Sequence, residues 1–342
     1  MMKIAIDGMG GDHAPQVICK GVNRALQEYD DIEILLFGDE AQLTPLVDPN
    51  ERLTIIHSEE VIEGDDEPVR AIRRKTKSSM VMAARSVRQK EADVLLSAGN
   101  TGALLASGLL IVGRIKNIDR PGLMPIIPTA STERPQLLLM DAGANADCKA
   151  INLHQFGILA NLYAKRVLNI PQPKVGLINN GTEASKGSEL SKAAYELLNQ
   201  EESIHFVGNI ESSQLLTGEV DIAITDGFTG NAILKSLEGT GKVIFSQIKQ
   251  QLLHSGVKAK LGGLLIKDAL LNLKDQFDDS KAGGAILLGV KGAVIKAHGS
   301  SNEEAIFNAI RQARIVHQSH VIDEFIEYFE QSDTITKQKE DK

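Results

Sequence analysis

The chain has few cysteines and no long apolar run, and both absences exclude classes of protein. Cys19 and Cys148 lie far apart and form no C-x-x-C motif or Cys/His cluster, which argues against a disulfide framework or a zinc site. The longest uncharged stretch, residues 97–113, contains glycine and asparagine and is shorter than the roughly 20 apolar residues that span a bilayer. We therefore expect a buried helix there. We expect no signal peptide, because a strand begins within three residues of Met1.

Positive charge is also scarce. The 342 residues include 37 Lys and Arg against 45 Asp and Glu, which gives a net charge of -8. A chain of this charge repels polyanions as a whole, so we expect no nucleic-acid partner. With 42% hydrophobic residues, the chain can bury one large core or two moderate lobes.

Two familiar nucleotide-binding motifs are incomplete, and a familiar catalytic motif is absent. The turn Gly8-Met9-Gly10-Gly11-Asp12-His13 has His13 where the dinucleotide fingerprint needs its third glycine. The segment Gly239-Thr240-Gly241-Lys242-Val243 has Val243 where a P-loop needs Ser or Thr for magnesium. No G-x-S-x-G nucleophile elbow occurs. An NAD(P)-dependent oxidoreductase is disfavoured by the broken fingerprint but stays open as an alternative.

Strand-like runs alternate with turns and helical segments along the whole chain. Seven apolar runs end in turns of Gly, Asn, Asp, Ser or Thr, and these turns begin at Asp7, Ser97, Asp141, Asn179, Gly208, Thr225 and Lys296. Helical periodicity covers residues 14–29, 68–90, 153–168, 188–200, 232–254 and 302–329. This alternation predicts an α/β fold, a largely parallel sheet with helices on both faces. We expect one domain over residues 1–330 and a frayed polar tail over 331–342.

The seven turns are expected to share the carboxyl edge of the sheet, where ligands bind. Glycine turns that lead into helices present unsatisfied N–H groups to an anion, so phosphate is the expected guest. The residues expected to bind phosphate or substrate are Gly10, Gly11, Asp12, His13, Asn100, Thr101, Gly102, Asn180, Thr182, Asp226, Gly227, Thr229 and His298.

Two residues in these turns are candidates for catalysis. Lys186 precedes a helix expected to begin near Ser188, a place that disfavours a merely solvated cation; its charge can neutralise phosphate or a developing oxyanion. Asn231 either caps the helix over 232–254 or points its amide at substrate.

The remaining polar residues in these turns leave more than one role open. His13 and His298 are either proton carriers, phosphate donors or simple loop residues. The strand-end carboxylates of Asp7, Asp141 and Asp226 could hold magnesium, but such residues commonly cap turns, so we expect no metal.

The segment 68–90 is basic. It contains no acidic residue, and Arg70, Arg73, Arg74 and Lys77 share one face at helical spacing. The face is either an ordinary solvated surface or a docking site for an acidic partner.

The segment 257–277 is amphipathic, with lysines opposite a leucine-rich face. It is either a core-facing or dimer-facing helix or an interfacial helix on anionic membrane. Gly262 and Gly263 would form a flexible point or a hairpin tip. The residues expected to contact membrane are Leu261, Leu264, Leu265, Leu270 and Leu273. A non-catalytic membrane scaffold would use both segments but would leave the glycine turns unexplained.

Six segments taken together resemble the bacterial phosphate acyltransferases of phospholipid synthesis. They are Ile-Asp-Gly-Met-Gly-Gly-Asp-His-Ala-Pro (6–15), Asp-Glu-Pro-Val-Arg-Ala-Ile-Arg-Arg-Lys (66–75), Ser-Ala-Gly-Asn-Thr-Gly-Ala-Leu (97–104), Gly-Thr-Glu-Ala-Ser-Lys-Gly (181–187), Thr-Asp-Gly-Phe-Thr-Gly-Asn (225–231) and Ile-Lys-Ala-His-Gly-Ser-Ser (295–301). The resemblance extends to about residue 320. One departure is the segment 281–284, where relatives often carry Tyr-Gly-Gly, and it puts local packing in doubt.

The resemblance implies a soluble enzyme without a cofactor that transfers a long fatty acyl chain from acyl-carrier-protein to inorganic phosphate. The acyl phosphate would feed a membrane-embedded glycerol-3-phosphate acyltransferase. The implied fold is similar to that of the phosphate acetyltransferase and isocitrate dehydrogenase group. The resemblance further implies a homodimer in the cytoplasm, at the inner face of the membrane, with Lys186 and Asn231 at the positions associated with activity. Because acyl-carrier-protein is acidic, Arg70, Arg73, Arg74 and Lys77 become its expected docking face.

Overall fold

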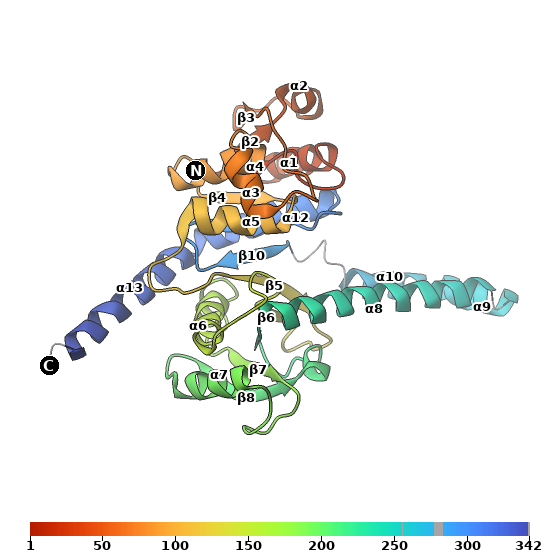
Figure 1. Cartoon of the computed structure of the whole chain (residues 1–342). Coiled ribbons are helices and arrows are strands. Elements are labelled where there is room, and N and C mark those ends of the chain that lie inside the picture. The colour runs from red at the N-terminus through yellow and green to blue at the C-terminus, as the bar shows by residue number, and fades with distance from the viewer. Residues whose placement is uncertain (255, 277–282, 341–342) are drawn as a thin grey trace.

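One sheet of eleven strands runs through the molecule (Figure 1). The computed structural model describes residues 1–254, 256–276 and 283–340. The strand order is β3-β2-β1-β4-β11-β10-β5-β6-β9-β7-β8. The strands are β1 Met2–Asp7, β2 Ile32–Gly38, β3 Leu53–His57, β4 Val94–Ser97, β5 Gly122–Pro128, β6 Gln136–Met140, β7 Lys174–Asn179, β8 His205–Glu211, β9 Ile222–Ile224, β10 Ala285–Leu288 and β11 Ala293–Lys296.

The sheet consists of two parallel halves that run in opposite directions. Strands β3, β2, β1, β4 and β11 are parallel, and so are β6, β9, β7 and β8. Between them, β10 is antiparallel to β11 and to β5, and β5 is antiparallel to β6. The carboxyl ends of the two halves therefore point opposite ways along the sheet. The expectation that all the turns share one edge is wrong, and the turns form two groups instead.

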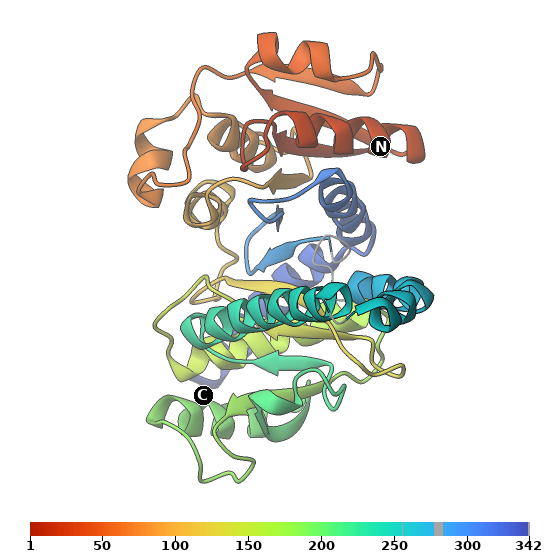
Figure 2. The same ribbon diagram turned by 90° about the vertical axis from the view of Figure 1, so that its right-hand side faces the viewer.

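The α/β fold with a largely parallel sheet and helices on both faces is confirmed (Figures 1 and 2). The helices are α1 Gln16–Glu28, α2 Glu40–Leu43, α3 Pro68–Arg74, α4 Ser79–Arg88, α5 Thr101–Ser107, α6 Ala150–Arg166, α7 Glu189–Gln200, α8 Gly227–His254, α9 Gly256–Leu265, α10 Lys267–Gln276, α12 Glu303–Gln318 and α13 Val321–Glu340, with shorter turns η1 Thr44–Leu46, η2 Gly108–Gly113 and η3 Ser212–Gln214. The helices predicted over 14–29, 153–168 and 188–200 and the buried helix within 97–113 are confirmed.

Alternation along the strands divides the core between the two faces. In β1, Ile4 and Ile6 belong to one buried cluster and Ala5 to another. The cluster of Ile4 and Ile6 continues across both halves, under α1, α6 and α12, whereas the opposite face carries separate clusters in the two halves. One shared core therefore joins the two halves, as expected for side chains that alternate between sheet faces.

Two predicted helices are interrupted. The segment 68–90 forms α3 and α4, separated where Ser78 adopts an extended conformation before the first residue of α4. The segment 302–329 forms α12 and α13, separated at His320, whose φ is +54°. Helical periodicity continues across both breaks, because buried positions on either side face the same core.

The prediction of a turn after Val207 is wrong. Gly208 and Asn209 lie inside β8, and the β7–β8 register shifts at the adjoining position, between Val175 and Gly176. Gly208 has a φ of +99°, so it supplies the left-handed residue of a bulge rather than a strand end.

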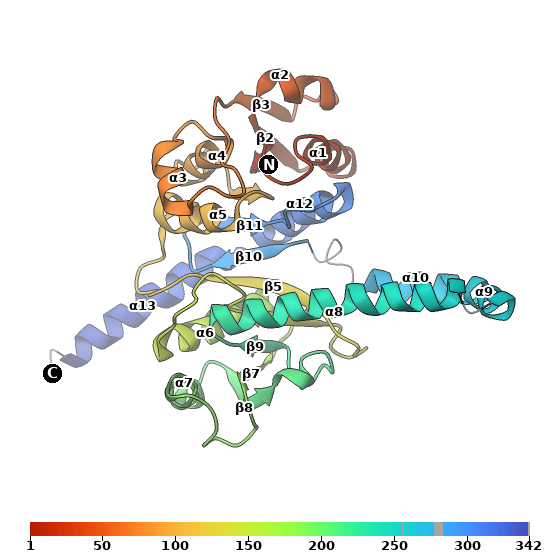
Figure 3. The same cartoon turned by 45° about the vertical axis from the view of Figure 1, so that its right-hand side comes forward.

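Helices α8, α9 and α10 form an arm that extends beyond the body of the molecule (Figures 1 and 3). Only Gly227 and Gly230, at the start of the 28-residue α8, are buried. Helix α9 packs at the far end of α8, where a Cβ atom on Gly263 would come 3.3 Å from Leu252. The amphipathic segment thus forms two helices that meet near Ile266 and not one. Phe277 of that segment lies outside the described residues.

The polar tail is helical where it is described. Helix α13 continues to Glu340 instead of fraying after residue 330. Residues 281 and 282 of the departing segment 281–284 lie outside the described residues.

Candidate active site

The first group of turns follows the neighbouring strands β1, β4 and β11. The Asp12 N–H donates to the Gly299 carbonyl at 2.8 Å, and the Ala297 N–H donates to the Ser97 carbonyl at 3.0 Å. A Cβ atom on Gly10 would stand 2.8 Å from the Gly99 nitrogen, so only glycine allows this approach. The three turns therefore form one continuous surface of backbone groups.

Asp7 holds this first group together. Its buried carboxylate accepts hydrogen bonds from Ser79 Oγ at 2.6 Å, Ser97 Oγ at 2.7 Å and the Met9 N–H at 3.2 Å. Burial raises the pKa of Asp7, against the hydrogen bonds from the two serines. The carboxylate fastens β1 to its neighbours, which matches the turn-capping role and not a metal ligand.

Some of the predicted residues of the first group are exposed, whereas others already form hydrogen bonds within the protein. Asp12 and His13 are exposed. The Asn100 side chain accepts from the Ala103 N–H at 3.0 Å, and its amide donates to the carbonyls of Glu63, Gly64 and Asp66. Thr101 and Gly102 begin α5. The contribution of this turn to a ligand is therefore expected from its backbone and not from the Asn100 amide.

His298 has one nitrogen committed to its own turn. The Ser300 N–H donates to His298 Nδ1 at 3.2 Å, which leaves the proton of a neutral ring on Nε2. Burial, with the charges of Lys296 and Lys235, lowers the pKa of His298. The imidazole is therefore mainly neutral at pH 7 and suited to donate a hydrogen bond from Nε2.

The second group of turns follows β6, β9 and β7, which are also neighbours. Asp141 anchors it, since its buried carboxylate accepts from the backbone N–H groups of Leu123 at 2.9 Å, Gly143 at 3.1 Å, Ala144 at 3.0 Å and Asn145 at 2.8 Å. Burial raises the pKa of Asp141. Both groups of turns are thus built around one buried aspartate at a strand end.

Asp226, and not Asn231, caps α8. Its carboxylate accepts from the Thr229 N–H and hydroxyl, both at 2.8 Å, and α8 begins at Gly227. The alternative that Asn231 caps the helix is therefore wrong, because the helix starts one turn earlier. Asn231 is exposed one turn into α8, and its side chain faces Gly143.

Lys186 lies in the turn between β7 and α7. Its carbonyl accepts from Asn179 Nδ2 at 3.1 Å, and the Ser188 hydroxyl accepts from the Ser191 N–H at the start of α7. The helix start near Ser188 is confirmed. Lys186 is exposed, as are Asn180 and Thr182, and within the described part of the chain no carboxylate forms an ion pair with its ammonium group.

The two halves are linked at the turn after β6 and along α8. Ala144, from the turn after β6, packs against the buried cluster of the first half that contains Leu95 and Ala103. Helix α8 starts in the second group and carries Lys235 close enough to Lys296 to affect its ionisation. Figure 2 shows α8 lying across the middle of the molecule, where the halves join.

Sequence reasoning missed Lys296. It is the last residue of β11 and is half-buried, and burial together with the charge of Lys235 lowers its pKa to about 8. A lysine that ends an otherwise buried apolar strand is a sequence feature that could have identified it.

Cys148 lies beside the second group but is not activated. Its Sγ is 3.6 Å from the Asn145 carbonyl oxygen. Burial, followed by the charges of Asp141 and Asp226, raises its pKa to about 11. The thiol is therefore protonated at neutral pH, which makes it a poor nucleophile.

The proposed basic docking face is only partly helical. Arg70, Arg73 and Arg74 are exposed on α3. Lys77 lies after α3, and its ammonium group binds both carboxylate oxygens of Glu59 at 2.9 Å. The helical spacing that placed Lys77 on this face is wrong, because α3 ends at Arg74.

The leucines predicted to contact membrane lie on the arm. Leu261, Leu264 and Leu265 are 59%, 70% and 86% exposed, which is unusual for such apolar side chains. Leu270 is half-buried. Leu273 lies in α10, and its side chain is outside the described part. None of the helices in residues 1–254, 256–276 and 283–340 is long and apolar enough to cross a membrane.

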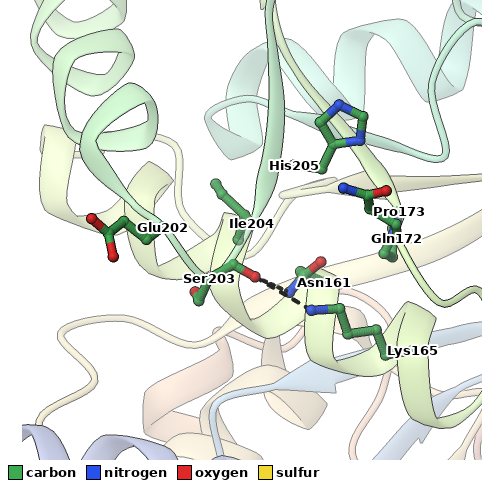
Figure 4. Close-up of a pocket in the computed structure, with 8 residues that line it drawn as sticks. All are labelled: Asn161, Lys165, Gln172, Pro173, Glu202, Ser203, Ile204 and His205. Atoms are coloured by element: carbon green, nitrogen blue, oxygen red, sulfur yellow. Dashed lines mark hydrogen bonds between the residues drawn. The ribbon is translucent and has the colours of Figure 1, made fainter.

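A pocket elsewhere contains none of the predicted residues (Figure 4). It lies beside the amino ends of β7 and β8, and Asn161, Lys165 and His205 line it. The Ser203 carbonyl at its wall accepts from Asn161 at 3.2 Å and from Lys165 at 3.3 Å. The pocket is at the opposite end of these strands from Lys186, so it is separate from the candidate site.

Metal ligands do not gather at the candidate site. No group of three His, Cys, Asp or Glu side chains that could hold a metal ion occurs among the described residues. The buried carboxylates of Asp7 and Asp141 are instead surrounded by hydrogen-bond donors.

Solved structures define the class of the fold. The chain is similar to a phosphotransacetylase from Streptococcus pyogenes, at a TM-score of 0.61 and 16% identity over 94% of each chain. It is also similar to a branched-chain phosphotransacylase from Enterococcus faecalis V583, at 0.56 and 17% identity over 92% of this chain and 99% of that one. A 4-hydroxythreonine-4-phosphate dehydrogenase from Klebsiella pneumoniae gives 0.52 and 12% identity, covering 92% of this chain and 99% of the dehydrogenase. The fold is thus that of an α/β class that includes phosphotransacylases and dehydrogenases.

Sequence relatives distinguish between these activities. The family described as fatty acid synthesis protein matches residues 2–324. The phosphate acyltransferase of Streptococcus sanguinis (strain SK36) is 53% identical over 94% of this chain and 96% of its own length, and that of Latilactobacillus sakei subsp. sakei (strain 23K) is 49% identical over 96% and 97%. The chain belongs to this family of phosphate acyltransferases and is an acyltransferase enzyme. The oxidoreductase and scaffold alternatives are set aside.

Proposed function

We propose that the enzyme transfers a long-chain fatty acyl group from acyl-carrier-protein to inorganic phosphate and forms acyl phosphate for phosphatidic acid synthesis. Support comes from a polar site that has anion donors but no activated nucleophile. The second group offers the exposed side chains of Lys186 and Asn231, while its nearby thiol, Cys148, is held protonated. Phosphate is already an anionic nucleophile, so the protein need only desolvate, hold and orient it.

In the proposed reaction, a phosphate oxygen attacks the thioester carbonyl carbon and a new C–O bond forms. Lys186 and the turn amides hold the phosphate, and Asn231 donates to the oxyanion of the tetrahedral intermediate. Collapse of the intermediate breaks the C–S bond and releases the carrier thiolate, which takes a proton from solvent. We propose His298, with Nε2 as its hydrogen-bond donor, and the exposed His13 as auxiliary residues from the first group.

Lys186→Ala tests this assignment, with Lys192→Ala as the matched control. Lys192 is another exposed lysine, one turn into α7. Acyl phosphate formation should fall about 100-fold or more in Lys186→Ala and remain near wild type in Lys192→Ala, with both variants melting as the wild type does. Near-normal turnover by a folded Lys186→Ala would remove Lys186 from the mechanism.

The arginines of α3 suit an acidic donor. Arg70, Arg73 and Arg74 add three exposed positive charges to a chain of net charge -8, and such a local patch steers an acidic partner. We propose these arginines as the docking face for acyl-carrier-protein, with Lys77 contributing less because Glu59 already pairs with it.

The arm suits a product that must reach a membrane. Its exposed leucines are expected to insert at the inner face of the cytoplasmic membrane, where acyl phosphate would pass to a membrane-embedded glycerol-3-phosphate acyltransferase. We propose peripheral association of a cytoplasmic enzyme.

We also propose that the enzyme is a homodimer. Sedimentation at micromolar concentration tests this proposal, and a monomer mass would contradict it.

A further inference from the structure

The cavity at the amino ends of β7 and β8 is a binding site that the acyl transfer does not use (Figure 4). Its walls come from the second half of α6 and from the segments that lead into β7 and β8. Its volume is about 190 Å³, below the roughly 300–1,000 Å³ of sites for drug-sized ligands. The occupant that fits is therefore a small molecule.

Asn161 presents an unused acceptor to this cavity. The residue is 1% exposed, and its Nδ2 donates to the Ser203 carbonyl at 3.2 Å. That contact fixes the orientation of the amide, because Oδ1 in the same place would face another acceptor. Oδ1 therefore points away from Ser203 (Figure 4), and no donor reaches it within the described residues. A ligand O–H or N–H would satisfy this buried oxygen.

Lys165 adds a positive charge to the same wall. It follows Asn161 by four residues, so both side chains share one face of α6. Its ammonium group also donates to the Ser203 carbonyl, at 3.3 Å, and it forms no ion pair with a carboxylate in the described part of the chain. One carbonyl oxygen uses only one of its three protons. The half-buried ammonium group therefore favours an anion in the cavity.

His205 and Gln172 supply further polar groups on the side that the Asn161 oxygen faces (Figure 4). Nδ1 of His205 is buried and has no hydrogen-bond partner among the described residues; it can donate in one tautomer. The Gln172 side chain is exposed at the rim, and its amide can donate as well. The carboxylate of Glu202 lies on the far side of Ser203 (Figure 4). The cavity thus offers one cation, two further donors and one acceptor that needs a donor.

We propose that this cavity binds a small hydroxylated anion. The anionic group, a carboxylate or a phosphate, accepts hydrogen bonds from Lys165, Gln172 and His205, while an adjacent hydroxyl group donates to Asn161 Oδ1. The site lies at the opposite end of β7 from Lys186, so it is separate from the candidate active site. The inference goes beyond the proposed function and does not depend on it.

Calorimetric titration of the full chain with glycerate and with glycerol 3-phosphate tests the site. Both probes carry an anionic group beside a hydroxyl group, and they differ in whether the anion is a carboxylate or a phosphate. At least one of them should bind saturably. Propionate and ethyl phosphate lack the hydroxyl group and should bind about tenfold or more weakly than their hydroxylated counterparts, because Asn161 Oδ1 then stays without a donor.

Substitutions in the wall locate the binding. Lys165→Met should weaken it about tenfold or more, because it removes a charge-assisted hydrogen bond, and Gln172→Ala about threefold. Asn161→Leu should abolish the preference for hydroxylated ligands. If that buried substitution unfolds the chain, Lys165→Met, Gln172→Ala and the ligand comparison still decide. Lys192→Met, at an exposed position of α7, is the control and should bind as the wild type does.

Separate outcomes overturn the site and the reaction. Failure of the wild type to bind either probe, or wild-type affinity in a folded Lys165→Met, overturns the site. Loss of binding in Lys186→Ala would place the probe in the candidate active site and would overturn it too. Because no acyl donor is present in these titrations, a chain that binds the probe but forms no acyl phosphate contradicts only the proposed reaction.

Discussion

Asn231 and Gly143 lie against each other: a Cβ atom on Gly143 would stand 3.6 Å from both Cβ and Oδ1 of Asn231. Gly143 has a φ of +129°, a conformation that favours glycine. The turn fixed by Asp141 therefore leaves the asparagine amide at the surface of the second group. Because Asp226 provides the helix cap, this amide is available to a substrate.

We predict that Asn231→Ala lowers kcat about 100-fold or more and changes the stability little, because it removes a hydrogen-bond donor to the transition state and no cap. Steady-state kinetics with both substrates, together with thermal melting, measure the two effects. Asn199→Ala, at an exposed position of α7, is the control. A folded Asn231→Ala with kcat within threefold of wild type would contradict the role.

The sequence predicted the local pattern better than the long-range one. Strand ends at Asp7, Ser97 and Asp141 were evident because apolar runs stop abruptly at turn residues. Gly208 gave the same pattern inside β8, since a bulge and a turn both use a glycine with positive φ. The reversal of the second half depends on antiparallel pairing of β10 with β5, which no local pattern encodes.

The site was partly predictable for the same reason. The roles of Lys186 and Asn231 stay predictions from their turns, although Asp226 replaces Asn231 as the cap of α8. The place of Lys296 at the end of an apolar strand was visible in the sequence, but its partial burial depends on the pairing of β11 with β4 and β10. The helix break after Arg74 comes from Lys75 and Ser78, which both leave the helical conformation, and periodicity across it concealed that break.

Charge reversal of the α3 arginines should weaken donor binding. In Arg70→Glu/Arg73→Glu/Arg74→Glu, we expect the KM for acyl-carrier-protein thioester to rise about tenfold, from exposed ion pairs of roughly 0.5 kcal/mol each. The salt dependence of KM should also decrease, and the KM for phosphate should stay the same. Kinetics at several ionic strengths measure both constants.

A matched control separates docking from net charge. Lys20→Glu/Lys192→Glu/Lys291→Glu changes the net charge by the same amount at three exposed lysines away from α3. An equal rise in the donor KM in both triple variants would reject a specific docking face.

The arm should determine membrane binding. Leu261→Glu/Leu264→Glu/Leu265→Glu places carboxylates on the exposed apolar surface, so flotation with anionic liposomes should fall severalfold or more. Leu270→Glu should have a smaller effect, because Leu270 is already half-buried. The control Val207→Glu changes a 42% exposed apolar residue of β8. Undiminished flotation of the triple variant would reject the arm as the membrane contact.

The partly buried charge of Lys296 should lower the stability of the wild type. The fall in its pKa from 10.5 to about 8 corresponds to roughly 3 kcal/mol for the charged form, and partial exposure reduces this to about 1–2 kcal/mol. At pH 7, Lys296→Met should therefore have a larger free energy of unfolding than the wild type. Denaturant unfolding measures the difference.

The pH dependence of that difference has a definite sign. Below pH 8, Lys296 is protonated in both the folded and the unfolded wild type, and the full stability cost of burying its charge applies. Between about pH 8 and 10.5 the unfolded chain holds more protons, so wild-type stability rises with pH. The advantage of Lys296→Met should shrink over this range. An advantage that is absent at pH 7, or that grows towards pH 10, would contradict the burial of this charge.

The most direct test is incubation of the purified wild type with long-chain acyl-carrier-protein thioester, with and without inorganic phosphate. Free carrier thiol and acyl phosphate are measured in the same samples, by thiol titration and by ³¹P NMR. We predict one acyl phosphate for each carrier released, and almost no release without phosphate. Release at the same rate without phosphate, or release that yields free fatty acid in place of acyl phosphate, would contradict phosphate as the attacking group.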